Sequence, residues 1–388
     1  MLILALALLS VFLVALIGRD LRSARAVPIL QPAPAGGAPA TIGAGARVSV
    51  IVPARDEAAR IGGLLDGLEC QTARDFEVLV LDDNSTDGTS SVVLARHGRL
   101  PDLQVIAGAP LPAGWSGKCW ACWQAAEAAT SPWLLFLDAD AAPAPGLIAA
   151  LIGRAQEREL DFLTLLPYLE LGSFAERLLM PPFTGLIQAV FPLDKVNDPA
   201  SPLAMANGQC ILIRRDVYFA TGGHSAVRDS VLEDVHLAQV IKGVGYRTEV
   251  AAGPELLQVR MYTTFAEIAE GLRKNAWAGY NAGGWRSAWG GARQALLAFG
   301  PSTILGAGVI AALMDSPTAV PLLLFGIGLC ALTTMYWGFT VSRLHRISPV
   351  WGLLFPLGTL GYFVLAGLAW ISIQRGTGVR WKGRAYRG

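Results

Sequence analysis

Four long apolar segments constrain the fold of this 388-residue chain more than any other feature. The first covers residues 1–18, and three more lie near the carboxyl end, at 295–314, 318–341 and 350–373. Each is long enough to form a helix that crosses a bilayer. Apolar residues make up 53% of the chain and charged residues only 16%, which is too apolar for an ordinary soluble enzyme. We therefore predict an N-terminal anchor at 1–18 and membrane segments within 295–373.

Basic residues follow the first apolar segment, at Arg19, Arg22 and Arg25. By the positive-inside rule, the N-terminus lies outside and the chain that follows is cytoplasmic. Residues 19–46 are predicted to be a basic flank followed by a flexible linker rich in Pro, Ala and Gly. This places the protein in the cell membrane as a multi-pass protein with a cytoplasmic central domain.

The basic tail, residues 374–388, should be cytoplasmic by the same rule. Three full crossings after a cytoplasmic domain would instead place it outside. We therefore predict that one of the three late apolar segments does not cross fully. The segment 295–314 is one candidate because it is short and contains Pro301, and 350–373 is the other because it could be re-entrant.

Residues 47–262 alternate short apolar strands with helical segments. Buried strands end at turn residues or acids, and the segments between them have helical spacing. This alternation predicts an α/β fold in which a mainly parallel sheet is covered by helices on both faces. The predicted strands are 48–52, 76–81, 103–106 and 133–137, and the predicted helices are 57–70, 90–97 and 117–129.

Charged side chains gather where these strands end. Arg55 follows the first strand, Asp82 and Asp83 end the second, and Asp138 and Asp140 follow the fourth. Because ligands of open α/β sheets bind at the carboxyl ends of the strands, these side chains should meet at one edge. Two acids separated by one residue can share a hard divalent cation, which in turn can hold the phosphates of a nucleotide. The sequence therefore predicts a nucleotide-and-metal site.

Three motifs contain these charged residues: Val-Ser-Val-Ile-Val-Pro-Ala-Arg-Asp-Glu57, Val-Leu-Asp-Asp-Asn-Ser-Thr-Asp-Gly-Thr89 and Leu-Phe-Leu-Asp-Ala-Asp140. They resemble the motifs of family 2 glycosyltransferases with the GT-A fold. The resemblance covers about residues 47–260. It implies that Asp82 pairs with the nucleotide base and that Asp138 and Asp140 hold Mg²⁺ or Mn²⁺. The implied nucleotide-sugar-binding residues are Pro53, Arg55, Glu57, Asp82, Asp83, Lys118 and Asp138.

Lys118 ends the stretch Gly114-Trp-Ser-Gly-Lys118, which precedes a predicted helix. A lysine in a glycine-permitted turn at a helix start suits a diphosphate. The same pattern resembles membrane glycosyltransferases associated with hopanoid and carotenoid pathways, and the tail resembles lipid-directed members of the family, including those of the ceramide type. Residues facing the acceptor are expected at Asn207, Gly208, Gln209 and Trp277.

Glu233 and Asp234 stand at the start of a predicted helix, where acids are common for dipole reasons alone. The family resemblance implies that Asp234, next to Glu233, is the catalytic base. Displacement at an anomeric carbon needs a carboxylate to accept the proton of the acceptor hydroxyl. An in-line displacement of this kind inverts the anomeric configuration.

Two segments are expected at the membrane interface. Residues 171–193 are apolar and contain Pro181 and Pro182, and residues 263–294 are amphipathic. The first lies between the predicted metal ligands and the base, and the second follows the base. Apolar walls at these places would let a lipid acceptor reach the site without leaving the bilayer.

These features together predict an inverting, metal-dependent glycosyltransferase. It would use a UDP- or GDP-sugar and a lipid hydroxyl of hopanoid, carotenoid or ceramide type, and the net charge of +1 gives no reason to expect nucleic-acid binding. Three alternatives are a processive polysaccharide synthase, a nucleotidyltransferase and a non-catalytic membrane scaffold. The first is disfavoured because Gln258-Val-Arg-Met-Tyr262 departs from the Gln-x-x-Arg-Trp motif of such synthases.

Overall fold

The computed structural model describes residues 1–32, 46–381 and 384–386. They form two compact units, which are described separately. The sheet unit comprises Ala26–Glu170 and Leu193–Met261, and the helical unit comprises Met1–Arg25, Leu171–Pro192 and Tyr262–Gly388. The expected domain at 47–262 is therefore interrupted, because its apolar insertion packs with the helical unit. Residues 33–45 of the predicted linker lie outside the described residues.

A seven-stranded sheet in the order β3-β2-β1-β4-β8-β6-β9 forms the centre of the sheet unit. β1 pairs in parallel with β2 and β4, and β2 pairs in parallel with β3. β8 is antiparallel to β4 and β6. The predicted mainly parallel α/β sheet is thus confirmed. The strand bounds are β1 Val48–Ala54, β2 Phe76–Asp82, β3 Leu103–Ala107, β4 Trp133–Leu137, β6 Phe162–Leu166, β8 Cys210–Arg214 and β9 Thr248–Ala252.

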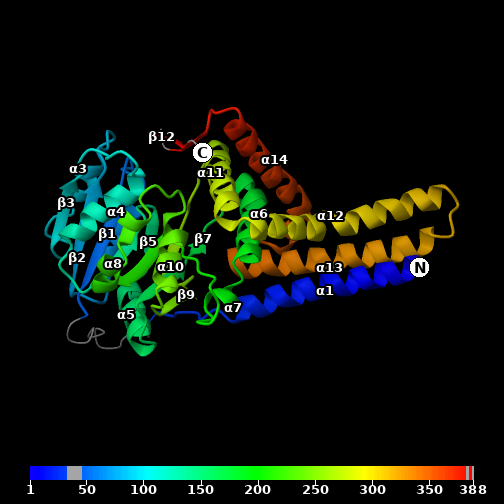
Figure 1. Ribbon diagram of the computed structural model, residues 1–388, viewed down its shortest axis with the longest axis horizontal. Coiled ribbons are helices and arrows are strands. Elements are labelled where there is room, and N and C mark those ends of the chain that lie inside the picture. Colours follow the sequence, from blue (N-terminus) through cyan, green and yellow to red (C-terminus); the bar gives the residue numbers. More distant parts are fainter. Residues whose placement is uncertain (33–45, 382–383, 387–388) are drawn as a thin grey trace. The chain divides into compact units, whose positions relative to one another are not determined.

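Helices cover both faces of this sheet (Figure 1). Because successive strand residues point to opposite faces, β1 places Val50 in one buried cluster and Ile51 in the other. The first cluster contains the apolar faces of α2 (Ile61–Glu69) and α5 (Leu147–Glu157). The second contains those of α4 (Gly117–Ala128) and α10 (Glu233–Gly243). A sheet buried on both faces explains why its strands read as nearly continuous apolar runs.

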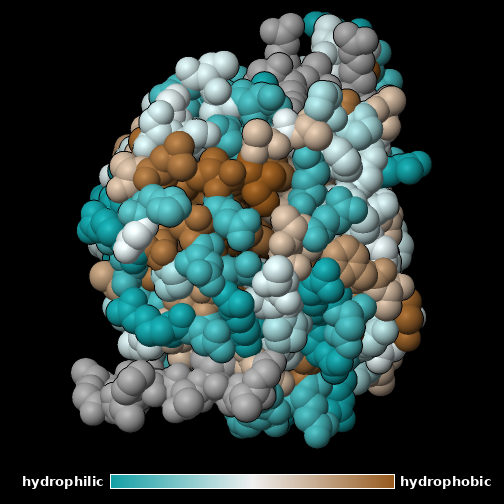
Figure 2. Space-filling view, turned by 90° about the vertical axis from the view of Figure 1, so that its left-hand side faces the viewer, coloured by the Kyte–Doolittle hydropathy of each residue, from teal (hydrophilic) through white to brown (hydrophobic). Residues whose placement is uncertain are grey.

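Shorter elements complete the sheet unit. A second sheet has three strands in the order β5-β10-β7, and its strand β5 follows β4 directly in the chain. The face seen in Figure 2 is largely hydrophilic, with one hydrophobic area set among polar side chains. The bounds are β5 Ala141–Pro143, β7 Tyr168–Leu169, β10 Leu257–Val259, α3 Thr89–Leu94, α7 Leu193–Val196, α8 Arg215–Ala220 and α9 Gly223–Ala226.

One local expectation, that the first strand ends at residue 52, was wrong. Pro53 does not stop β1, which continues to Ala54, because Pro53 lies beyond the last β1–β4 pair and its ring costs no ladder hydrogen bond there. Just before the predicted linker, Leu30 donates its N–H to the carbonyl of Ala252 at 2.8 Å. That bond covers part of the β9 edge, which would otherwise expose backbone groups.

The helical unit contains helices long and apolar enough to cross a membrane. Within the described residues, four are found, at Leu2–Arg25, Trp285–Leu313, Ala319–His345 and Pro349–Gln374. The first extends beyond the predicted anchor, so that Arg19, Arg22 and Arg25 are helical. The bounds are α1 Leu2–Arg25, α6 Phe174–Val190, α11 Phe265–Gly283, α12 Trp285–Leu313, α13 Ala319–His345, η1 Pro349–Leu354, α14 Phe355–Gln374, β11 Val379–Trp381 and β12 Arg384–Tyr386.

α6 is one helix although it contains Pro181 and Pro182. A proline inside a helix removes a hydrogen bond and leaves the carbonyl four residues earlier without its helical donor. Here other elements of the helical unit pack against this region. Gln294 of α12 donates to the Pro182 carbonyl at 2.9 Å, and Gly358 of α14 lies against the Leu178 carbonyl. Tertiary contacts therefore stabilise a helix that its own sequence disfavours.

Candidate active site

The carboxyl end of β2 holds Asp82 in a fixed turn. Its Oδ1 accepts the Ser85 N–H at 2.8 Å, and its Oδ2 accepts the Ser90 hydroxyl. Burial alone would raise the pKa of Asp82, but these hydrogen bonds outweigh it and place the pKa below its ordinary value. Asp82 is therefore an ionised acceptor at neutral pH. Ser85 and Ser90 were not among the site residues predicted from the sequence.

The loop after β1 packs against the loop after β2. The Arg55 guanidinium lies 3.6 Å from a carboxylate oxygen of Asp83, and the Glu57 N–H donates to the Thr89 hydroxyl at 2.9 Å. Pro53 stands within β1, paired with Leu81. The structure thus brings the predicted residues of these two loops together at one edge of the sheet. Their assignment to a nucleotide remains a prediction.

Lys118 joins two acids that are far apart in the sequence. It is the second residue of α4, which is N-capped by Ser116. Its Nζ lies 2.7 Å from Oδ1 of Asp138, just after β4, and 3.0 Å from Oε1 of Glu233, at the start of α10. Burial opposes the charge of Lys118, but the two carboxylates outweigh it and raise the lysine pKa well above its ordinary value. The ammonium group is therefore charged and centred between two acids.

Asp234 is held beside this cluster. Its Oδ2 accepts the Gly208 N–H at 2.8 Å, and its Oδ1 accepts the Val235 N–H at the same distance. Burial, and after it the charge of Glu233, raises the pKa of Asp234 to about 6. A carboxylate with that pKa is ionised at pH 7 and is a better proton acceptor than an ordinary aspartate.

Gly208 lies close to both Lys118 and Asp234. A Cβ at this position would lie 3.1 Å from the Lys118 Nζ and 3.2 Å from the Asp234 Oδ2. Its neighbours are also held, because the Asn207 side chain accepts the Gln209 N–H and the Gln209 carbonyl accepts the Asp138 N–H. Of the predicted acceptor residues, these three thus adjoin the base and Asp138. The fourth, Trp277, lies on α11 of the helical unit.

The donor set suits a small divalent cation. Among the described residues, no group of three or more His, Cys, Asp or Glu side chains is placed to hold a metal. Proteins nonetheless often bind Mg²⁺ through only one or two carboxylates, such as Asp138 and Asp140 of this loop. Water and phosphate oxygens are then the other ligands of the ion. These residues therefore fit such an ion when it arrives with a diphosphate.

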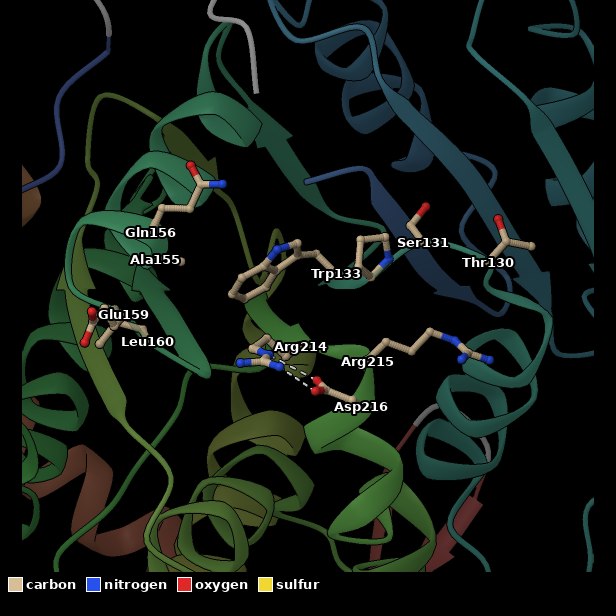
Figure 3. Close-up of a pocket in the computed structure, with 11 residues that line it drawn as sticks. Thr130, Ser131, Trp133, Ala155, Gln156, Glu159, Leu160, Arg214, Arg215 and Asp216 are labelled. Carbon is tan, nitrogen blue, oxygen red and sulfur yellow. Dashed lines mark hydrogen bonds and ion pairs between the residues drawn. The ribbon is translucent and has the colours of Figure 1, made fainter. Parts of the chain in front are cut away.

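A cleft of about 670 Å³ lies at the opposite edge of the sheet (Figure 3). It is lined by the amino end of β4, at Trp133, and by the carboxyl end of the antiparallel β8, at Arg214. Arg214 is paired there with Asp216. None of the predicted site residues lines this cleft, so its position does not support a role in the predicted chemistry.

Comparisons with known proteins show what this chain resembles in sequence and in fold. Residues 49–220 match the family described as Glycosyl transferase family 2. This segment is a family 2 glycosyltransferase domain. The chain is 25% identical over 356 residues to 4,4'-diaponeurosporenoate glycosyltransferase of Staphylococcus aureus strain MRSA252, and the alignment covers 87% of this chain and 88% of that protein.

A solved structure supports the fold of the glycosyltransferase domain. It is the mannosyltransferase PcManGT from Pyrobaculum calidifontis in complex with GDP-Man and Mn²⁺. The TM-score is 0.55 with 21% sequence identity, and the match covers 94% of this chain and 98% of that chain. At this identity the likeness establishes the fold alone. The predicted GT-A fold is confirmed.

Proposed function

We propose that this protein is an inverting glycosyltransferase that moves a sugar from a nucleotide-diphosphate sugar to a lipid hydroxyl at the cytoplasmic membrane face. The observation that carries the proposal is the cluster at the carboxyl edge of the sheet. There Asp82, the pair Asp138 and Asp140, and Asp234 stand at three separate strand or helix ends. Each position suits one part of the reaction. Asp82 would bind the nucleotide base of the donor, Asp138 and Asp140 would hold the cation at its diphosphate, and Asp234 would face the acceptor hydroxyl.

The donor would be a UDP- or GDP-sugar bound with Mg²⁺ or Mn²⁺. The PcManGT structure contains GDP-Man and Mn²⁺, which supports this class of donor and metal. Asp138 and Asp140 would hold the cation, which when bound supplies Lewis-acid stabilisation of the departing diphosphate. Lys118 would contribute a second positive charge to the same phosphates, since its ammonium group already lies beside Asp138.

In the transfer step, Asp234 accepts the proton of the acceptor hydroxyl. The acceptor oxygen forms a bond to the anomeric carbon while the bond from that carbon to the phosphate oxygen breaks. The electron pair of the broken bond leaves with the nucleoside diphosphate. Because attack and departure occur on opposite faces of the sugar, the configuration inverts. The Gly208 N–H orients Asp234 for this role.

The lipid nature of the acceptor is supported by the apolar helical unit and by the Staphylococcus relative, whose name specifies diaponeurosporenoate. That name denotes a carboxylate, which favours a second candidate function. A carboxylate acceptor has no proton to lose at neutral pH, so a transferase that esterifies it would not need Asp234 as a base. Loss of Asp234 therefore separates the two reactions.

The test uses the purified full-length protein with radiolabelled UDP- and GDP-sugars and a lipid extract of its host. We expect label in the organic phase, with release of nucleoside diphosphate. Label confined to water-soluble polymer would support a polysaccharide synthase, and release of pyrophosphate would identify a nucleotidyltransferase. Failure to bind any nucleotide would support the scaffold alternative.

A further inference from the structure

The charged residues of the helical unit gather at one end of a three-helix bundle. α1, α12 and α13 run side by side (Figure 1). At one level of this bundle, Asp20 of α1 accepts hydrogen bonds from Arg293 of α12 and, at 2.8 Å, from Tyr336 of α13. Arg293 is only 4% exposed. An ion pair in so apolar a bundle is costly unless its partners are satisfied, so it fixes the register of the three helices.

The same end of the bundle carries all its basic residues. They stand in the last turns of α1, in the first turns of α12, and in the last turn of α13 or directly after it. The opposite end consists of residues 1–8 and the α12–α13 turn at 311–320, and these stretches contain no Lys or Arg. The positive-inside rule therefore places the charged end in the cytoplasm. The basic residues are Arg19, Arg22, Arg25, Arg286, Arg293, Arg343 and Arg346.

The bundle has the length of a bilayer core. From the Asp20 network to the far end, α1 has 18 residues, α12 has 20 and α13 has 17. At 1.5 Å per residue these stretches span about 26–30 Å, compared with about 30 Å for the hydrocarbon layer. The antiparallel register agrees, since Gly308 of α12 packs against Leu323 of α13 and Gly326 packs against Leu305. α1, α12 and α13 are thus matched to three crossings.

α14 packs differently. It starts at the charged end, where Phe355 stacks on Trp337 with ring centroids 3.4 Å apart. From there it packs on α6 and α11, and in Figure 1 it runs at a steep angle to the three long helices. A Cβ on Gly358 would lie 2.1 Å from the Leu178 carbonyl of α6, so the two helices are in close contact. Near its other end, Ser372 accepts a hydrogen bond from Arg273 of α11 at 2.7 Å.

The opposite face of α14 is an exposed apolar stripe. At 100° per residue its five members fall within about 80° of one another, opposite the buried side chains of Phe355, Thr359 and Tyr362. Each is between 39% and 53% exposed. A stripe of this size on a helix normally binds an apolar partner. It consists of Leu357, Leu360, Val364, Leu368 and Ile371.

We infer that α14 does not cross the membrane but lies along the cytoplasmic leaflet, with this stripe immersed in lipid. The inference rests on the proposed membrane location. We favour lipid as the partner because the stripe begins at the charged end of the bundle. At that level the lipid-facing surface of the bundle meets the cytoplasm. It also resolves the conflict over the tail. With three crossings and one in-plane helix, the basic tail stays cytoplasmic, and 350–373 rather than 295–314 is the segment that does not cross.

Sidedness is tested with epitopes in the full-length protein in intact cells. An epitope inserted at Ser316, in the α12–α13 turn, should be accessible from outside, whereas one added after residue 388 should become accessible only after permeabilisation. An accessible C-terminal epitope would overturn the inference. The glycosyl-transfer assay on the same protein reports separately on the proposed function.

Depth is tested with a nitroxide side chain at Leu357, Val364 or Ile371 in the full-length protein in lipid vesicles, with Ile327 of α13 as the spanning control. In-plane placement predicts equal depths at the three α14 positions, each shallower than Ile327, from relaxation by oxygen and by a water-soluble nickel complex. If the depth in the bilayer were greatest at Val364, α14 would cross the membrane, and the inference would be overturned. Protection from both reagents would mean that protein, not lipid, covers the stripe, and would overturn it as well.

Discussion

The sheet unit and the helical unit both contain partly or fully buried charges, but they balance them differently. In the helical unit, Asp20 is matched by Arg293 and hydrogen-bonded by Tyr336. In the sheet unit, one cation, Lys118, stands between the carboxylates of Asp138 and Glu233, and Asp234 lies beside them. Negative charge is therefore in excess at this edge, and burial, followed by the charge of Glu233, raises the pKa of Asp234. The first arrangement stabilises a structure, whereas the second is suited to binding cations and moving a proton.

The sharpest test of this contrast removes a carboxylate from the proposed metal site. Asp138→Asn or Asp140→Asn should lower transfer by about a thousandfold or more, because stabilisation of several kcal/mol by the metal is lost. Donor binding should no longer depend on a divalent cation, while the circular dichroism spectrum stays unchanged. Full activity of the unaltered protein in EDTA would contradict the metal site.

In the helical unit, removing a charge should lower the stability of the protein. Arg293→Ala leaves the partly buried Asp20 without its cation, and we expect a loss of about 3 kcal/mol in the free energy of unfolding. The double variant Asp20→Leu with Arg293→Met should recover most of this loss, since a buried ion pair can be replaced by apolar groups. Thermal unfolding in detergent measures both. An unchanged unfolding temperature for Arg293→Ala would show that the pair does not hold the bundle.

Asp234→Asn should lower kcat by about a hundredfold or more and leave donor affinity intact, because only proton transfer from a hydroxyl acceptor is lost. Asp216→Asn, at the opposite edge of the sheet, is the matched control and should be unaffected. Weaker donor binding with normal turnover would instead place Asp234 in the donor site. Unimpaired transfer to a carboxylate acceptor would support the esterifying function.

The pH dependence follows from the same group. Because burial and Glu233 raise the pKa of Asp234 to about 6, turnover should fall as the pH decreases through 6, where the base becomes protonated. The raised pKa also means that the folded state binds this proton more tightly than the unfolded state. Its contribution to stability is therefore fully present below the ordinary aspartate pKa and is lost as the pH rises through 6. Asp234→Asn should remove both effects.

The smallest expected effect comes from Gly208→Ala. The added methyl group would press on the Lys118 Nζ and the Asp234 Oδ2, at 3.1 and 3.2 Å. A displacement of a few tenths of an ångström should lower kcat by about tenfold without unfolding the protein, because catalysis depends on the position of the base. The matched control is Gly153→Ala on α5, where a Cβ meets nothing within 4 Å. Equal activity of the two variants would show that the close approach at Gly208 is unimportant.

Much of the sheet unit could be predicted from sequence, because its signals are local. The apolar runs of β1, β2 and β4 mark buried strands, and the acids at their ends fall at one edge of a parallel sheet. The four apolar helices were predicted for the same reason. The relation of Lys118 to Glu233 could not be found this way, since 115 residues separate them and no periodic pattern links the start of α4 to the start of α10.

The sequence by itself determined the four strands β1 to β4, which helices are apolar enough for a membrane and where the acids gather, since these depend on neighbours along the chain. Only the tertiary structure decided that Lys118 joins two acids, that Pro181 and Pro182 remain inside α6, and that α14 packs on α6 and α11. Each of these depends on a contact between distant segments: an ammonium group between two carboxylates, a glutamine side chain on a proline carbonyl, and a glycine against a helix backbone. Such contacts form only when the chain has folded, and residue spacing carries no record of them.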